Sequence, residues 1–195
     1  MGTDGRSWMM FVDGENFTLR AQKIAQVEGI ALTEGDNYKR DCFVWVPQSQ
    51  GTSNFTRHRI PNIAPLETFA LRSYYYTSLQ GDTDAITAAR EVVRRRGFEP
   101  KIFKRNSSQR QSKGVDIALA TDMLAHAFQA HYEVAVLVAG DADYLPLVEQ
   151  VKRLGRSLHV WFFVGPESGL ADELRLAADL FFDIGTEFAL QWRGR

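Results

Sequence analysis

Two aspartates, Asp141 and Asp143, directly follow an apolar run of strand length and could bind a metal ion. The run, Val134–Val138, is rich in β-branched residues, and apolar positions at near-helical spacing come after the Gly-Asp-Ala-Asp turn. The turn contains no basic residue that could neutralise the two carboxylates. In open α/β sheets, sites form where strands end, and unpaired carboxylates at such an edge are costly. The pattern therefore predicts a strand–turn–helix unit whose aspartates bind a cation.

Two further aspartates could join that site. Asp13 follows an apolar segment at residues 8–12, and Asp116 lies near the start of a strongly apolar segment of helical length at residues 115–130. Because turns after parallel strands open on one edge, Asp13 and Asp141 could converge, with Asp116 arriving from a helix N-terminus. Several carboxylates together suit a hard cation such as Mg²⁺ or Mn²⁺. Such an ion can activate water for attack on a phosphoryl group.

Several of these side chains also have an ordinary structural explanation. An aspartate after a strand often caps the next helix, which could be the role of Asp143, and Asn16 could be a capping residue in the same way. Asp116 could compensate the dipole of its helix. Asp122 lies further along that helix, about 120° around its axis from Asp116, where it could contact His126. The sequence alone leaves both kinds of role open.

A basic segment extends from residue 90 to residue 113. Its only acidic residues are Glu91 and Glu99, although the whole chain has a net charge of -1. A local excess of this kind could follow the phosphates of a nucleic acid beside the carboxylate site. It could equally be a solvated helix face followed by a loop. The candidate nucleic-acid-binding residues are Lys104, Arg105, Arg110 and Lys113.

The elements that must position these residues alternate along the chain. Strand-like segments lie at residues 8–12, 41–46, 67–77, 98–103, 134–138, 157–164 and 181–184. Helical patterns lie at residues 17–27, 82–96, 115–130, 145–154 and 170–180. This alternation predicts an α/β fold with a mainly parallel central sheet. The turn-rich stretch at 47–65 has no periodicity, which predicts an insertion or long surface loop within about residues 29–65.

Composition excludes several other classes of protein. A length of 195 residues suits one domain, and 45% hydrophobic with 24% charged residues predicts a globular core. The single cysteine, Cys42, rules out an intrachain disulfide and a cysteine zinc cage. No Walker loop, GxGxxG motif or GxSxG elbow is present, and no apolar run reaches membrane-spanning length. Without a signal-peptide pattern, a soluble cytoplasmic protein that binds no membrane is expected.

At these motifs the sequence resembles the NYN domains of the LabA-like branch, which belong to the PIN-like metal-dependent nucleases. The matching motifs, in the family's order, are FVDGEN (11–16), SYYYT (73–77), KGVDIALATDM (113–123), LVAGDADYLPLVEQVKRLG (137–155) and a closing L-x-x-x-A-D-x-F (174–181). The resemblance implies a three-layer α/β/α sandwich of the PIN-like, Rossmannoid type. It also implies a Mg²⁺- or Mn²⁺-dependent ribonuclease acting on single-stranded or structured RNA.

The resemblance assigns roles to the acidic residues. It implies that the catalytic and metal-binding residues are Asp13, Asp116 and Asp141. The accessory positions that it implies are Asn16, Asp122 and Asp143.

The chain departs from the family pattern at two positions. Ala139 stands where the family usually has Ser, and Tyr144 where Phe is commoner. The missing hydroxyl at position 139 could have oriented a water or a metal ligand. An alternative is therefore a catalytically inactive NYN module that binds RNA, or a protein partner or second copy through residues 47–65.

Overall fold

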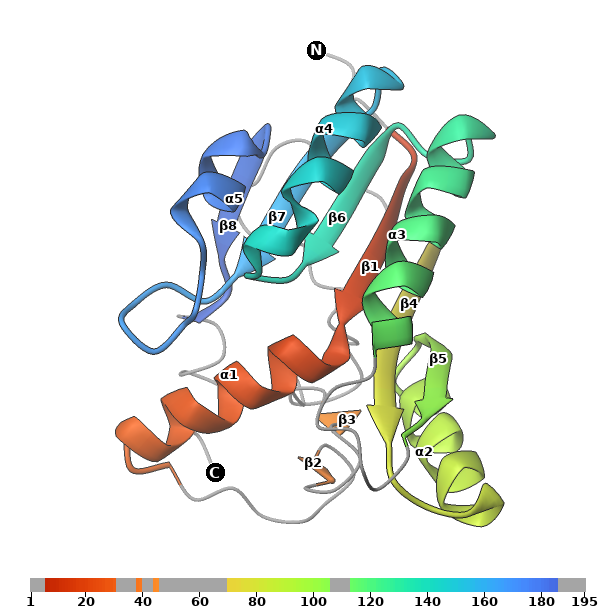
Figure 1. The fold of residues 1–195 in the computed structure, drawn as a ribbon, viewed down its shortest axis with the longest axis vertical. Coiled ribbons are helices and arrows are strands. Elements are labelled where there is room, and N and C mark those ends of the chain that lie inside the picture. Colours follow the sequence, from red (N-terminus) through yellow and green to blue (C-terminus); the bar gives the residue numbers. More distant parts are fainter. Residues whose placement is uncertain (1–5, 31–37, 40–43, 46–69, 106–112, 186–195) are drawn as a thin grey trace.

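A central parallel sheet organises the molecule (Figure 1). The structure is a computed structural model and describes residues 6–30, 38–39, 44–45, 70–105 and 113–185. The sheet has six strands in the order β5-β4-β1-β6-β7-β8, and each neighbouring pair is parallel. The strands are β1 (Trp8–Asp13), β4 (Arg72–Leu79), β5 (Glu99–Lys104), β6 (Val134–Val138), β7 (Ser157–Phe162) and β8 (Leu180–Asp183). The predicted parallel α/β fold is confirmed.

Helices cover both faces of this sheet. They are α1 (Gly14–Val27), α2 (Thr83–Arg95), α3 (Lys113–Phe128), α4 (Leu145–Arg153) and the short α5 (Asp172–Ala177). Because side chains alternate along a strand, Met10 and Val12 of β1 pack in one core with α1 and α2. Met9 and Phe11 pack in the other core with α3 and α4, and Figure 1 shows α3 and α4 in front of the sheet. The molecule is therefore a three-layer α/β/α sandwich.

The middle strands β1 and β6 are buried along their whole length. Helices on both faces of a parallel sheet produce such continuous apolar strands. Their register pairs Val12 with Val138, so their carboxyl ends lie side by side. Residues that follow the two strands, Asp13 at one and the Gly140-Asp141 turn at the other, are consequently brought to the same edge of the sheet.

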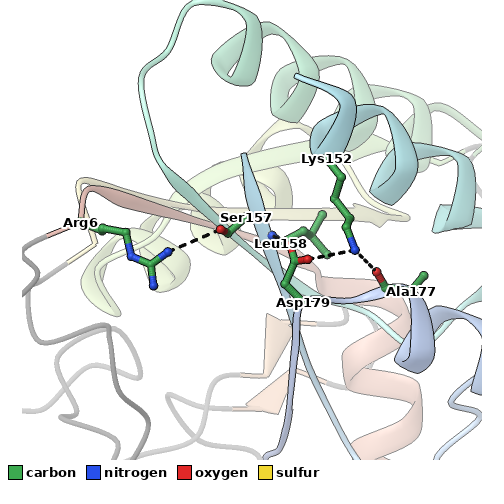
Figure 2. Close-up of polar contacts among 6 residues, drawn as sticks. All are labelled: Arg6, Lys152, Ser157, Leu158, Ala177 and Asp179. Atoms are coloured by element: carbon green, nitrogen blue, oxygen red, sulfur yellow. Dashed lines mark hydrogen bonds and ion pairs between the residues drawn. The ribbon is translucent and has the colours of Figure 1, made fainter. Parts of the chain in front are cut away.

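A carboxylate with a structural role lies near the β8 edge of the sheet (Figure 2). Asp179 accepts a hydrogen bond from the backbone N–H of Leu158 at 2.8 Å and pairs with the Lys152 ammonium at 2.9 Å. Lys152 also donates to the carbonyl of Ala177 at 2.9 Å. Asp179 thus joins α4, α5 and β7, and its charge is matched by a lysine.

The observed boundaries differ from the predicted ones where pairing or capping decides them. The strand expected at 67–77 runs from Arg72 to Leu79, because β5 pairs with it as far as Leu79. The helix expected over 170–180 is only α5, since the chain is already extended at Ala178 before it enters β8. Within the expected insertion, the described residues include β2 (Tyr38–Lys39) and β3 (Val44–Trp45), which pair antiparallel. The rest of residues 31–69 lies outside the described part of the chain.

No helix among the described residues is long and apolar enough to cross a membrane.

Candidate active site

A cavity of about 430 Å³ opens at the carboxyl ends of β1 and β6. It is lined by one side of α1, the first turn of α3 and the turn after β6, which forms a short 3-10 helix, η1 (Ala142–Tyr144). Its lining residues are Asp13, Glu15, Asn16, Leu19, Arg20, Lys23, Asp116, Asp141 and Asp143. Five of the six predicted catalytic and accessory residues are among them, and the sixth, Asp122, is not.

Asp13 is the most buried carboxylate of the cavity, with 4% of its surface exposed. One of its oxygens, Oδ1, accepts a hydrogen bond from the backbone N–H of Asn16 at 2.9 Å and so caps α1. The other, Oδ2, accepts from the Tyr144 hydroxyl at 2.9 Å. Asp13 can therefore both cap α1 and belong to the site, because each role uses a different oxygen.

The same hydroxyl of Tyr144 lies 3.2 Å from Oδ1 of Asp116. A hydroxyl has one proton, so Tyr144 can donate to only one of the two carboxylates at a time. The oxygens of Asp13 and Asp116 therefore share a single hydroxyl proton between two negative charges. Sequence reasoning marked Tyr144 only as a departure from the family pattern, and nothing in the local sequence shows that its ring reaches β1 and α3.

The electrostatics of the cavity reflect uncompensated negative charge. Burial, with the nearby charge of Asp116 in addition, raises the pKa of Asp13 from 3.8 to about 7, although the bond from the Asn16 N–H opposes the shift. Burial also raises the pKa of Asp116, and the charges of Asp141 and Asp143 add to it. Among the described residues, none of these four aspartates forms an ion pair. A cation would relieve this repulsion.

The turn after β6 is fixed to the start of α1. Asp141 Oδ1 accepts from the backbone N–H of Asp143 at 3.2 Å and caps η1, a role that had been considered for Asp143. Gly140 donates its N–H to Oδ1 of Asn16 at 3.2 Å. A side chain at position 140 would overlap the ring of Phe162, so this close approach requires glycine. Asn16 thus holds the two aspartate-bearing turns together instead of capping α1 itself.

Glu15 is a member of the cavity that the sequence did not single out as a ligand. Its Oε2 accepts from the Ser78 hydroxyl at 3.1 Å, and its Oε1 lies 3.6 Å from Nη1 of Arg105. Arg105, predicted to bind phosphate, is therefore engaged with Glu15 in this structure. Lys104 is exposed at the end of β5, whereas Arg110 and the side chain of Lys113 lie outside the described part of the chain. Nucleic-acid binding by these four residues stays a prediction.

Asp122 lies outside the cavity on α3. Its Oδ2 accepts from the Tyr76 hydroxyl at 2.9 Å and pairs with Lys101 at 3.0 Å. Asp122, which could have contacted His126, forms its hydrogen bond and ion pair with these two residues, and His126 bonds Tyr74 at 3.0 Å. The rotation of about 120° around α3 that separates Asp122 from Asp116 explains why they face different surroundings.

The residues present fit a hard divalent cation. All the donors are oxygens, and Mg²⁺ is usually held by one or two carboxylates together with waters and substrate phosphates. Asp13 and Asp116 supply such a pair around the position of the Tyr144 hydroxyl. Within the described residues, no group of three Asp, Glu, His or Cys side chains is arranged to hold a metal ion. Asp141 lies close enough to raise the pKa of Asp116 and is therefore a neighbour of the pair.

Ala139, which replaces the family's usual Ser, is fully buried in the core on the α3 and α4 side. It is not among the residues that line the cavity. The substitution therefore leaves the carboxylate arrangement intact.

The fold is that of an α/β protein with an acidic cavity at the carboxyl edge of its parallel sheet. A sequence model of the NYN domain family matches residues 7–185, and the chain belongs to this family, a member of the PIN-like nuclease superfamily. It is 33% identical over 100 residues to an uncharacterized protein of Methanocaldococcus jannaschii, a match covering 51% of this chain but only 37% of that relative. The crystal structure of a protein of unknown function from Vibrio parahaemolyticus RIMD 2210633 has the same fold, with a TM-score of 0.61, 18% identity and coverage of 96% and 99% of the two chains.

Proposed function

We propose that the protein is a Mg²⁺- or Mn²⁺-dependent ribonuclease that hydrolyses phosphodiester bonds in single-stranded or structured RNA. The observation that carries this proposal is the buried carboxylate of Asp13, which shares one hydroxyl with Asp116 and has no cationic partner among the described residues. Membership of a nuclease family supports the same class of reaction. The open cavity beside the pair leaves room for a phosphate group.

Each residue of the site has a distinct part in this proposal. Asp13 and Asp116 would hold the ion, which supplies an activated water and stabilises the charge that develops on the phosphoryl group. Asp141 lines the same cavity and adds negative charge near Asp116, and it would contribute a third ligand, directly or through a water. Asn16 holds the turn after β6 against α1, which keeps the carboxylates on the two turns at a fixed spacing.

The test is cleavage of a labelled RNA with Mn²⁺ or Mg²⁺, with and without chelator, by the unmodified protein and by Asp141→Asn. We expect cleavage that requires the ion and that the substitution abolishes. Asp84→Asn is a matched control, because Asp84 is exposed in the first turn of α2 and does not line the cavity. Activity unaffected by both chelator and Asp141→Asn would refute the metal mechanism.

The same experiment separates the enzyme from an inactive module. Tight RNA binding without cleavage, across divalent ions and RNA substrates, would favour a non-catalytic NYN module.

A further inference from the structure

Arg20 is a cationic residue of the cavity that no motif had indicated. It lies on α1, half-buried, and lines the same cavity as the aspartates. Among the described residues it forms no ion pair and no hydrogen bond. Five carboxylates line the same cavity, yet none of them pairs with Arg20, and a half-buried guanidinium without a partner is unfavourable. This arrangement leaves its donors available for an anion that enters the cavity.

The surface beneath Arg20 is shaped to receive its side chain. The guanidinium lies directly against Gly169, where a Cβ atom would overlap it. Gly169 has a φ of 64°, in the left-handed region that favours glycine. The absence of a side chain at position 169 thus makes room for Arg20, and the backbone conformation is a second reason for glycine there.

The loop that carries Gly169 is itself anchored. The Ser168 hydroxyl donates to the carbonyl of Gly165 at 2.7 Å and accepts from the N–H of Leu170 at 3.2 Å. The N–H of Ala171 donates to the carbonyl of Gly140 at 2.8 Å, which attaches the loop to the turn that bears Asp141. Arg20 therefore rests on a fixed surface that is continuous with the acidic site.

Lys23, one turn further along α1, also lines the cavity but differs in one respect. It pairs with Glu167 of the same loop, so its charge is already matched. Arg20 is consequently the cavity's unpaired cation among the described residues. Its planar fork of donors matches two oxygens of a phosphate group, whereas an ammonium offers no such geometry.

We propose that Arg20, supported by Gly169, binds a phosphate of the RNA strand directly beside the carboxylate pair. The inference rests on the proposed ribonuclease function and adds the residue that would hold the substrate there. It places the strand across α1 and the loop between β7 and α5, a surface distinct from the segment at 104–113.

The experiment measures binding of a fluorescein-labelled oligouridylate by anisotropy, with Mg²⁺ present and in the Asp141→Asn background to prevent cleavage. Arg20→Ala should weaken binding roughly tenfold to a hundredfold, because hydrogen bonds to a charged group are lost. The salt dependence should flatten by about 0.7 for one phosphate contact on a single strand. Arg20→Lys should bind with an affinity between those of the parent protein and Arg20→Ala, since it keeps the charge but not the planar fork of donors.

Arg153→Ala provides the matched control, because Arg153 is exposed on α4, pairs with Glu149 and does not line the cavity. It should leave the affinity unchanged. Gly169→Ala is a second variant that displaces the guanidinium without changing the net charge, with circular dichroism to confirm folding. It should weaken binding by itself and add nothing to Arg20→Ala, because both changes act on the same contact.

Unchanged affinity and salt slope in Arg20→Ala would overturn the inference, as would no measurable binding by the parent protein. Its failure is distinguishable from failure of the ribonuclease proposal. Metal-dependent RNA cleavage by the unmodified protein, with binding insensitive to Arg20, would refute only the role of Arg20. Binding that depends on Arg20 without cleavage in any divalent ion would refute only the catalytic proposal.

Discussion

Two aspartates on the same helix, Asp116 and Asp122, have opposite surroundings. Asp122 accepts a hydrogen bond from Tyr76 and pairs with Lys101, so its charge is matched. Asp116 shares the Tyr144 hydroxyl with the buried Asp13. Burial raises the pKa of Asp116, and the charges of Asp141 and Asp143 raise it further. The residue type and the helix are common to both. The difference lies in the partners that the neighbouring strands and turns supply, and it separates a structural carboxylate from one suited to a cation.

The first way to test this comparison is to neutralise each aspartate and measure RNA cleavage. Asp116→Asn should reduce cleavage by about a hundredfold or more, because loss of residues that merely orient metal ligands already costs 10- to 100-fold. Asp122→Asn should leave cleavage nearly unchanged, since Asp122 does not line the cavity and the amide oxygen can still accept from Tyr76. Equal losses in the two variants would contradict the distinction.

A second test uses pH. Because Asp13 must be deprotonated to bind an ion, Mn²⁺ affinity should fall about tenfold per unit as the pH decreases below the Asp13 pKa of about 7 and level off above it. The sign for stability is opposite. The metal-free folded state binds more protons than the unfolded state between pH 3.8 and about 7, so its stability should decrease as the pH rises through this window.

Calorimetric titration of Mn²⁺ at several pH values, with thermal unfolding of the metal-free protein alongside, checks both statements. Asp13→Asn is the control that should reduce the pH dependence of stability in this window, leaving the smaller part that comes from the raised pKa of Asp116. Mn²⁺ affinity independent of pH below 7 would show that Asp13 does not bind the ion.

A third test concerns the hydroxyl between the two carboxylates. In Tyr144→Phe the ion no longer competes with that hydroxyl for oxygens of Asp13 and Asp116, so Mn²⁺ binding should tighten by up to about tenfold. The metal-free protein should become less stable, because the repelling carboxylates lose their shared partner. The increase in melting temperature on adding Mn²⁺ should therefore be larger than in the unmodified protein. Weaker Mn²⁺ binding would indicate instead that the hydroxyl prearranges the ligands.

Much of the fold follows from local sequence. The apolar run at 134–138 and the helical spacing after it predicted β6 and α4, because strand and helix periodicities differ and both segments are long enough to show them. The convergence of Asp13 and Asp141 followed from parallel topology, which places the turns that follow the strands on one edge. These features depend on patterns within single segments and on a general rule of connection.

The partners of the charged side chains could not be predicted in this way. Tyr144 bonds a residue 131 positions away, and Arg20 rests on Gly169 of a loop near the other end of the chain. Such contacts depend on how elements far apart in the sequence pack at the sheet edge, which periodicity does not encode. The pairing of Arg105 with Glu15 likewise joins the end of β5 to the start of α1. The sequence predicted that this arginine binds phosphate, and it did not reveal that Glu15 is its partner.

The fourth test asks whether Asp122 is structural, as its contacts indicate. Asp122→Ala should destabilise the protein by about 1–3 kcal/mol, because the hydroxyl of the fully buried Tyr76 would lose its acceptor. Lys101 cannot replace that acceptor, since an ammonium group only donates. Asp122→Asn should cost less, because it removes the charge but keeps an oxygen for Tyr76.

The matched change in the cavity is Asp116→Ala, measured in the same metal-free buffer by urea unfolding. It removes a carboxylate that raises the pKa of Asp13, so it should leave stability unchanged or slightly increase it. The two aspartates would then differ in both measurements, with Asp122 needed for stability and Asp116 for cleavage. A larger loss of stability in Asp116→Ala than in Asp122→Ala would show that the acidic cavity, too, is held together by its carboxylates, and the contrast along α3 would fail.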